Sequence, residues 1–209
     1  MKSLTSILQF SYKLIQNIIG ITFYPYKTYF HLTHEKTPSL GIVFMLLVPF
    51  YVVFATILRN GLFHVSLLFL FTTFGKYTIG IWTAFLLSFF ALLIMAELLK
   101  QRDRKLIIFN LWAFSYIPTY IWFGVTAILF LLLPPPRTES LLGQSFSIFF
   151  ISFSLFVFLW KLLLYYLTLR IGLRMTLLEV VLASILLFPL FGIFSLASYK
   201  MGIFRVPFV

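Results

Sequence analysis

The chain has 209 residues, of which 62% are hydrophobic and 10% are charged. Soluble domains are about half apolar and a quarter charged, so this composition excludes a water-soluble fold and predicts an integral membrane protein. The formal net charge of +11 comes from Lys and Arg residues that stand mostly singly between apolar segments. No DNA- or RNA-binding motif accompanies them, which argues against nucleic acid as a partner.

Residues 1–39 are predicted to form an amphipathic interfacial helix followed by an elbow. The apolar side chains of one helical face are Leu4, Ile7, Leu8, Leu14, Ile15, Ile18 and Ile19, and polar residues lie opposite. We expect a helix over residues 4–19 that lies along the cytoplasmic membrane interface, with Leu8 and Ile15 buried. Packing of the helix on the protein's own spans is the alternative. Pro25 ends the helix and begins the elbow.

A transmembrane helix needs roughly twenty apolar residues to cross a bilayer. Five apolar segments have about this length and predict five transmembrane helices. They are residues 40–58, 79–98, 106–133, 143–169 and 175–198, within a transmembrane domain over residues 40–199. Residues 200–209 form a short C-terminal tail. Residues 62–75 are apolar but, at about fourteen residues, too short to cross, so we expect an outer-leaflet or re-entrant hairpin there. The predicted fold class is an all-α polytopic membrane protein.

The basic residues of the short loops predict the orientation of these spans. The N-terminal segment, residues 100–105, Arg170 and Arg174 all fall on one side of a five-span arrangement. Because cytoplasmic loops are enriched in Lys and Arg, we expect the N-terminus in the cytoplasm and the C-terminus outside. The cytoplasmic location of this loop is enough to account for the basic cluster of Lys100, Arg102, Arg104 and Lys105. Contact of these four side chains with anionic lipid headgroups is a further hypothesis.

Two prolines within predicted spans are expected to kink their helices. Pro118 lies in the third span after Ser115, and Pro189 lies in the fifth span, where Gly192 follows it. Proline removes one backbone hydrogen bond and clashes with the preceding turn, and hydroxyl side chains partly compensate the freed backbone groups.

Three ionisable side chains fall within or at the ends of spans, where an unpaired charge is costly. Glu97 is expected to form an ion pair with Lys100 at headgroup level. Lys161 and Glu179 lie at comparable depth on either side of the turn near residues 170–174, so we expect an intramembrane ion pair between them. Snorkelling of Lys161 to the headgroups and a site for a proton or an anionic substrate are the alternatives.

The sequence contains no recognisable set of catalytic residues. Its three His all precede residue 65, and with five acids they provide no nucleophile and base and no clustered metal ligands. His31, His34 and Glu35 are interpreted as a solvated loop rather than a metal site. Phosphate-binding and protease motifs are absent, and so is cysteine. We therefore expect a protein that is not an enzyme and that has no cofactor.

Three motifs resemble the Yip (Ypt-interacting protein) domain family of membrane proteins. They are Pro25 with Tyr29-Phe30, Phe114-Ser115-Tyr116-Ile117-Pro118, and Trp160-Lys161 through Leu169-Arg170-Ile171-Gly172-Leu173. Eukaryotic members bind small GTPases through a long cytosolic region before the spans, whereas here residues 1–39 precede the first predicted span. The resemblance therefore implies the short, bacterial-like form in the bacterial cytoplasmic (inner) membrane, with a five-span fold and no defined reaction.

Three functions from different classes remain open. The first is a non-enzymatic scaffold or accessory subunit that packs against other integral membrane subunits, and it accounts for the missing catalytic groups. The second is a lipid-handling or transport component, which the kinked helices and Lys161 favour. The third is a membrane-shaping or trafficking protein that uses its amphipathic N-terminus. Membrane lipids are expected partners in every case.

Overall fold

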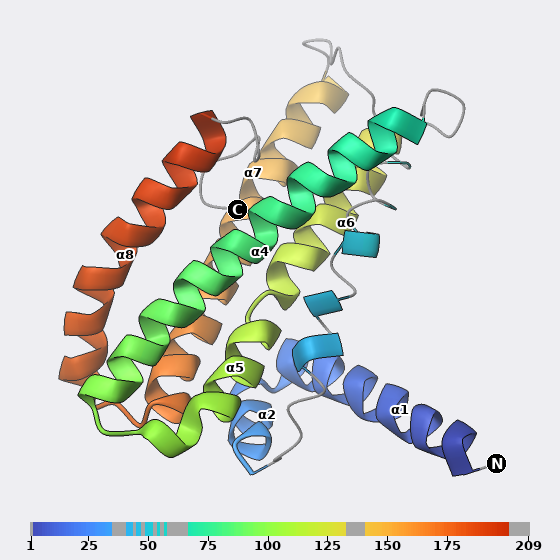
Figure 1. Ribbon diagram of the computed structural model, residues 1–209. Helices are drawn as coiled ribbons and strands as arrows, with labels where there is room; N and C mark the ends of the chain where they lie inside the picture. The colour runs from blue at the N-terminus through green and yellow to red at the C-terminus, as the bar shows by residue number, and fades with distance from the viewer. Residues whose placement is uncertain are drawn as a thin grey trace.

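The computed structural model describes residues 2–34, 41–43, 45–46, 49–51, 54, 57, 67–132 and 141–200, which are helical apart from short links (Figure 1). The helices are α1 (Lys2–Phe23), α2 (Pro25–Leu32), α4 (Leu67–Leu98), α5 (Lys105–Phe114), α6 (Ile117–Leu132), α7 (Leu141–Leu167) and α8 (Leu177–Lys200). A 3-10 turn, η2 (Arg102–Arg104), precedes α5, and a π-helical turn, η3 (Thr168–Gly172), follows α7. The predicted all-α class is confirmed over these residues.

Four segments of the described chain are long and apolar enough to cross a membrane. They are Thr78–Leu98, Lys105–Leu129, Gly143–Gly172 and Leu177–Lys200, and they correspond to the second to fifth predicted spans. Together with the composition, they support an integral membrane protein with several spans. The first predicted span, 40–58, is described only in part, and of the tail, 200–209, only Lys200 is among the described residues.

The predicted re-entrant segment, 62–75, differs from the structure where it is described. Leu67 to Gly75 form the N-terminal part of α4, which continues as one uninterrupted helix to Leu98. The physical reason is that no proline interrupts this sequence and a single glycine is tolerated inside a long apolar helix. Because 32 residues of helix extend about 48 Å, α4 is longer than the roughly 30 Å hydrocarbon core.

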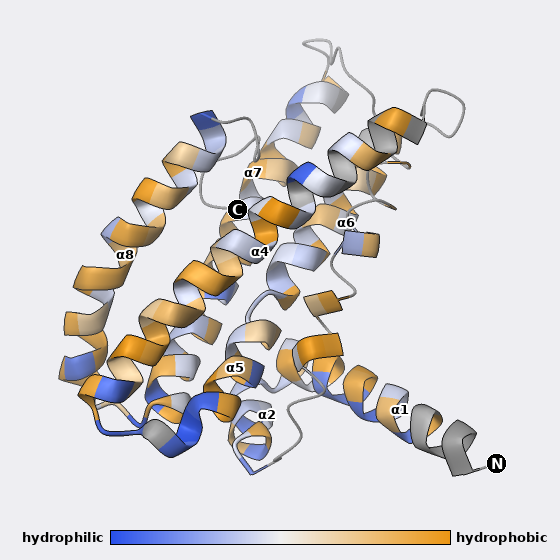
Figure 2. Ribbon diagram, in the orientation of Figure 1, coloured by the Kyte–Doolittle hydropathy of each residue, from blue (hydrophilic) through white to orange (hydrophobic). Residues whose placement is uncertain are grey.

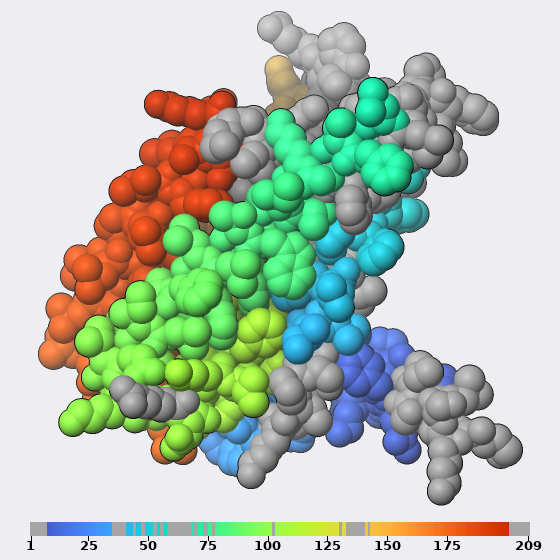
Figure 3. Space-filling view, viewed as in Figure 1, coloured from blue at the N-terminus to red at the C-terminus, as the bar shows by residue number. Residues whose placement is uncertain are grey.

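The helices of the bundle surround a central element formed by α5 and α6. In the most apolar stretch of that span 67% of the residues are buried, whereas in the corresponding stretch of the α7 span 11% are buried. On the face seen in Figure 3, α4 and α8 cover the bundle. In Figure 1 these two helices lie close together at the end that carries η2 and diverge toward the other end.

Polar residues gather at the end of the bundle that carries η2 and η3. Figure 2 shows a hydrophilic patch at the turn between α4 and α5, and α1 and α2 lie at this same end (Figure 1). Arg170 lies in η3, and Arg174 lies in the link that joins η3 to α8. The segments that the sequence places in the cytoplasm are therefore neighbours in space.

Helix α1 exposes residues that the sequence predicts to be buried. Leu8 and Ile15 are 62% and 55% exposed in the protein alone, so they do not pack within it, and their burial in the membrane interface stays a prediction. The buried side of α1 carries Leu14, Asn17 and Ile21. The reason is that the apolar residues of α1 form two strips, and the bundle contacts one of them. The other strip, which includes Leu8 and Ile15, is predicted to lie in the membrane interface.

The central span is interrupted at the predicted proline kink. Helix α5 ends at Phe114 and α6 begins at Ile117, directly before Pro118. The Ser115 hydroxyl donates to the Trp112 carbonyl at 2.6 Å, and the Ser115 backbone N–H lies 3.1 Å from the Leu111 carbonyl oxygen. These bonds satisfy backbone groups that have no water to bind inside a membrane. Helix α8, by contrast, continues through Pro189.

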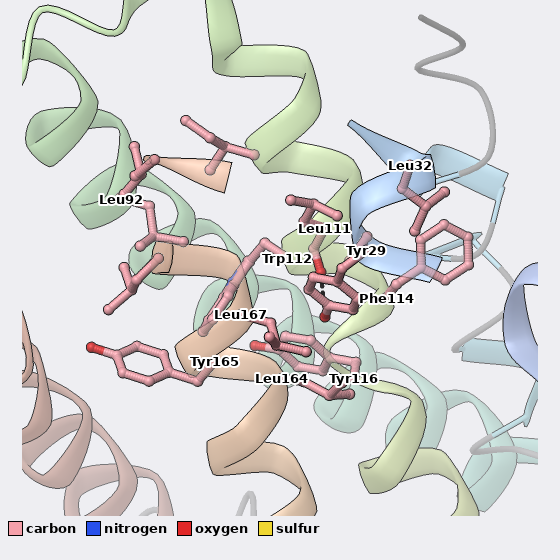
Figure 4. Packing of buried hydrophobic residues seen from close by; sticks show 14 of the residues in the cluster. Tyr29, Leu32, Leu92, Leu111, Trp112, Phe114, Tyr116, Leu164, Tyr165 and Leu167 are labelled. Carbon is pink, nitrogen blue, oxygen red and sulfur yellow. Dashed lines mark hydrogen bonds between the residues drawn. The ribbon is translucent and has the colours of Figure 1, made fainter. Parts of the chain in front are cut away.

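Tyr29 anchors α2 against the central span. Its side chain is 0% exposed, and its hydroxyl donates to the Leu111 carbonyl at 3.1 Å (Figure 4). Burial raises the pKa of the Tyr29 hydroxyl, so it stays protonated and available as a donor. This contact joins the N-terminal hairpin of α1 and α2 to the bundle, one turn before the interruption of the central span.

Arg104 ties η2 to η3. Its guanidinium donates to the carbonyl oxygens of Ile171 at 2.9 Å and Gly172 at 2.7 Å, which end the π-helical turn. Desolvation lowers the Arg104 pKa, and the nearby positive charge of Arg174 lowers it further, although an arginine remains charged in proteins. Arg104 is therefore a cap that joins the ends of two hairpins.

Arg104→Gln is expected to destabilise the bundle by about 1.5–3 kcal/mol, because hydrogen bonds from a charged donor to two carbonyls are lost. Thermal unfolding in detergent measures this loss. Lys100→Gln is the matched control, since Lys100 lies in the same link and is exposed. Equal midpoints for the two variants would contradict the capping role of Arg104.

Candidate functional site: a cavity within the bundle

A cavity of about 440 Å³ lies among α4, the central span, α7 and α8. Each of these elements contributes to its wall, for example Ala84 from α4, Tyr116 from the central span, Phe158 from α7 and Phe191 from α8. Small-molecule sites span roughly 300–1,000 Å³ and are mostly apolar with a few polar groups, and this cavity matches both descriptions. It is partly open rather than enclosed.

Most polar groups of the wall are already bonded within the protein. The Trp112 indole N–H donates to the Ser88 hydroxyl at 2.8 Å, and the Ser115 hydroxyl bonds to the backbone of its own turn. These bonds fix the side chains of the aromatic wall and leave few free donors. The interior is thus a largely apolar chamber with fixed walls.

Lys161 supplies a positive charge to the wall of this chamber. Its Nζ lies 5.1 Å from the centre of the Tyr116 ring, so the ammonium faces the bundle interior. No acidic residue of the described chain pairs with it. A cation–π contact contributes about 0.5–2 kcal/mol, whereas a lysine at mid-membrane costs at least about 2.5–3.5 kcal/mol. The ring therefore offsets only part of the cost.

The predicted ion pair between Lys161 and Glu179 is not formed. Glu179 is partly exposed and accepts hydrogen bonds from the Thr176 backbone N–H at 2.6 Å and the Thr176 hydroxyl at 3.0 Å. The Thr176 hydroxyl also lies 3.4 Å from the Glu179 backbone N–H, so the two residues form a capping box at the start of α8. The cap accounts for Glu179, because it satisfies backbone donors at a helix N-terminus.

Tyr165 adds a second polar group to the wall. It lies four residues after Lys161, so both side chains project from one face of α7. Its ring packs 5.4 Å from that of Phe188, and Figure 4 shows its hydroxyl directed away from the Tyr29–Leu111 contact. Ser184 is a neighbour, but the buried Tyr165 hydroxyl has no partner at hydrogen-bonding geometry. An unpartnered buried hydroxyl costs free energy unless a bound molecule satisfies it.

The basic cluster of residues 100–105 is partly committed to the protein itself. Lys105 forms an ion pair with Glu97 at 3.0 Å, where the sequence predicts Lys100 as the partner of that acid. Arg104 caps η3. Lys100 is exposed and has a left-handed backbone, with φ of 58°, as it turns the chain out of α4. Headgroup contacts of Lys100, Arg102, Arg104 and Lys105 stay a prediction.

The described residues contain no cluster of three or more His, Cys, Asp or Glu side chains that could hold a metal ion. His34 Nδ1 lies 3.0 Å from the Phe30 carbonyl oxygen, which ties that ring to its own helix. Glu35, the third member of the sequence motif, lies outside the described residues.

Comparison with protein-family models, curated proteins and solved structures returns no match. The resemblance to the Yip domain family therefore stays a prediction. The cavity is the feature that sequence reasoning missed. Its signal in the sequence is the spacing of Lys161 and Tyr165 on one face of a span, but the facing helices are not visible from that spacing.

Because Lys161 and Glu179 lie apart, the effects of Lys161→Met and Glu179→Gln on stability should add to within about 0.5 kcal/mol. A double-mutant cycle in detergent measures the coupling. The pair Glu97 and Lys105 is the control, for which we expect a coupling of about 0.2–1 kcal/mol at partly exposed positions. Coupling above about 1 kcal/mol between Lys161 and Glu179 would contradict the observed geometry.

Proposed function

We propose that this protein is a non-enzymatic integral membrane protein that takes an amphiphilic lipid from the bilayer into its intramembrane cavity. The main support for this proposal is the apolar cavity of about 440 Å³ among four helical elements, with a lysine in its wall. Of the functions open from the sequence, this observation favours lipid handling. A catalytic function has no support from the wall, which carries no acid or histidine among the described residues.

The arrangement of the helices supports access from the bilayer. Helices α4 and α8 both line the cavity, which is partly open, and the two helices diverge away from the end of the bundle that carries η2 (Figure 1). A lipid chain moving between them would stay in an apolar medium throughout. An aqueous substrate would meet an aromatic wall with few free polar groups, so the surroundings favour an amphiphile.

The orientation proposed for this function places the N-terminus in the cytoplasm and the C-terminus outside. Lys100, Arg104, Arg170 and Arg174 lie in or beside η2 and η3 at one end of the bundle and support this orientation, because the positive-inside rule counts such short loops. Lys161 lies about 9 Å along the axis of α7 from Leu167 at the basic end, which puts the charge in the cytoplasmic half of the span.

Gly192→Leu should reduce the amount of lipid that copurifies with the protein. Gly192 lines the cavity, and a Cβ atom added there meets no other atom within 4 Å, so the leucine side chain can occupy the chamber. The variant should also unfold at a higher temperature after delipidation, because it fills a void and replaces a helical glycine. Native mass spectrometry counts the retained lipid.

Gly75→Leu is the matched control for this experiment. Gly75 is also a helical glycine with open space beyond its Cα atom, but it does not line the cavity. Its replacement should leave the retained lipid unchanged. If Gly192→Leu folds and retains as much lipid as the unmodified protein, the proposed function is wrong.

The scaffold function is a second candidate, and the exposure of α7 favours it. Only 11% of the residues in the most apolar stretch of the α7 span are buried, so most of this stretch can pack on another membrane subunit. A photo-crosslinker at Ile151, which is 66% exposed, should then join the chain to one defined protein in intact membranes. The control position is Val157, which is 6% exposed on the same helix. Crosslinks at Ile151 to lipid alone would count against a partner on this face.

A further inference from the structure

We propose that the amphiphile held in the cavity is anionic and that Lys161 is its counter-cation. This inference rests on the proposed function and names the class of ligand for it: a single apolar chain with one carboxylate or phosphate head. The two heads share the chemistry that Lys161 recognises, which is a negative charge with oxygen acceptors. A neutral lipid of the same length would fill the chamber without using that charge.

The charge balance of the bundle interior is the first support. Lys161 faces the interior over the Tyr116 ring, and Glu179, which the sequence predicts as its partner, caps α8 instead. The groups that surround the ammonium from α4, the central span and α8 are apolar side chains, aromatic rings and hydroxyls. None carries a negative charge, so a bound anion would supply the missing one.

The position of the polar groups is the second support. Lys161 and Tyr165 are separated by one helical turn on α7, and both line the cavity. The Tyr165 hydroxyl is buried without a hydrogen-bond partner. One carboxylate or phosphate has enough oxygen atoms to accept a hydrogen bond from each donor. The apolar chain would then extend along Phe158, Phe191 and Phe194, which line the same chamber.

A set of three probes with one common alkyl chain tests this inference: palmitic acid, hexadecyl phosphate and hexadecanol. Binding to the delipidated, full-length protein is measured by native mass spectrometry and by the shift of the unfolding midpoint. We expect both acids to bind at least about tenfold more tightly than the alcohol, as a charge-assisted hydrogen bond implies. The relative affinities of the two acids distinguish a fatty acid from a phosphate lipid.

Lys161→Met should lower the affinity for both acids by about tenfold to a hundredfold and leave hexadecanol binding within about twofold. Lys161→Arg should retain the preference for the acids, and Tyr165→Phe should weaken it by a few-fold, on the order of one lost hydrogen bond. Lys200→Met, at the end of α8, is the control for loss of a positive charge outside the cavity. Hexadecanol binding also shows that each variant is folded.

The possible outcomes separate this inference from the function on which it rests. If all three probes bind equally, or if Lys161→Met keeps the preference for the acids, the anionic ligand is wrong and the lipid-binding function stands. If none of the probes binds the unmodified protein, the proposed function fails and the inference fails with it. A preference for the acids that disappears in Lys161→Met and persists in Lys200→Met supports both.

Discussion

The buried contact between Tyr29 and the Leu111 carbonyl fixes the part of the bundle on which the rest depends. Leu111 lies in the last turns of α5, and the same carbonyl receives the backbone N–H of Ser115, where the helix is interrupted. A helix broken inside a membrane exposes backbone groups that water cannot satisfy. Side chains and backbone groups around the break satisfy them here, so the central span changes direction without leaving its neighbours.

That interruption positions the wall of the cavity. Ser115 and Tyr116 form the break itself, and both line the chamber. Tyr116 lies in the link between the two helices of this span, and the centre of its ring lies 5.1 Å from the Lys161 Nζ. The aromatic neighbour of the intramembrane charge therefore comes from the interruption that precedes Pro118.

Much of the fold could be predicted because membrane spans are encoded locally. Four predicted spans agree to within a few residues with the segments that are long and apolar enough to cross a membrane, although α4 itself begins earlier, at Leu67. The break before Pro118 lies where a proline should disrupt hydrogen bonding. The predicted ion pair between Lys161 and Glu179 is absent because equal depth in the membrane does not specify the direction in which a side chain points around its helix. The local signal was present, since Thr176-Leu177-Leu178-Glu179 has the spacing of a capping box.

The remaining features depend on contacts between distant segments, which no local pattern contains. The bonds from Arg104 to Ile171 and Gly172 join two loops, and the two apolar strips of α1 differ only in which one meets the bundle. The cavity has the same origin, since its wall combines residues from α4, the central span, α7 and α8. A molecule bound there would contact both helices and stabilise their arrangement by mass action. The space that no side chain fills is therefore where a ligand can contribute to the stability of the bundle.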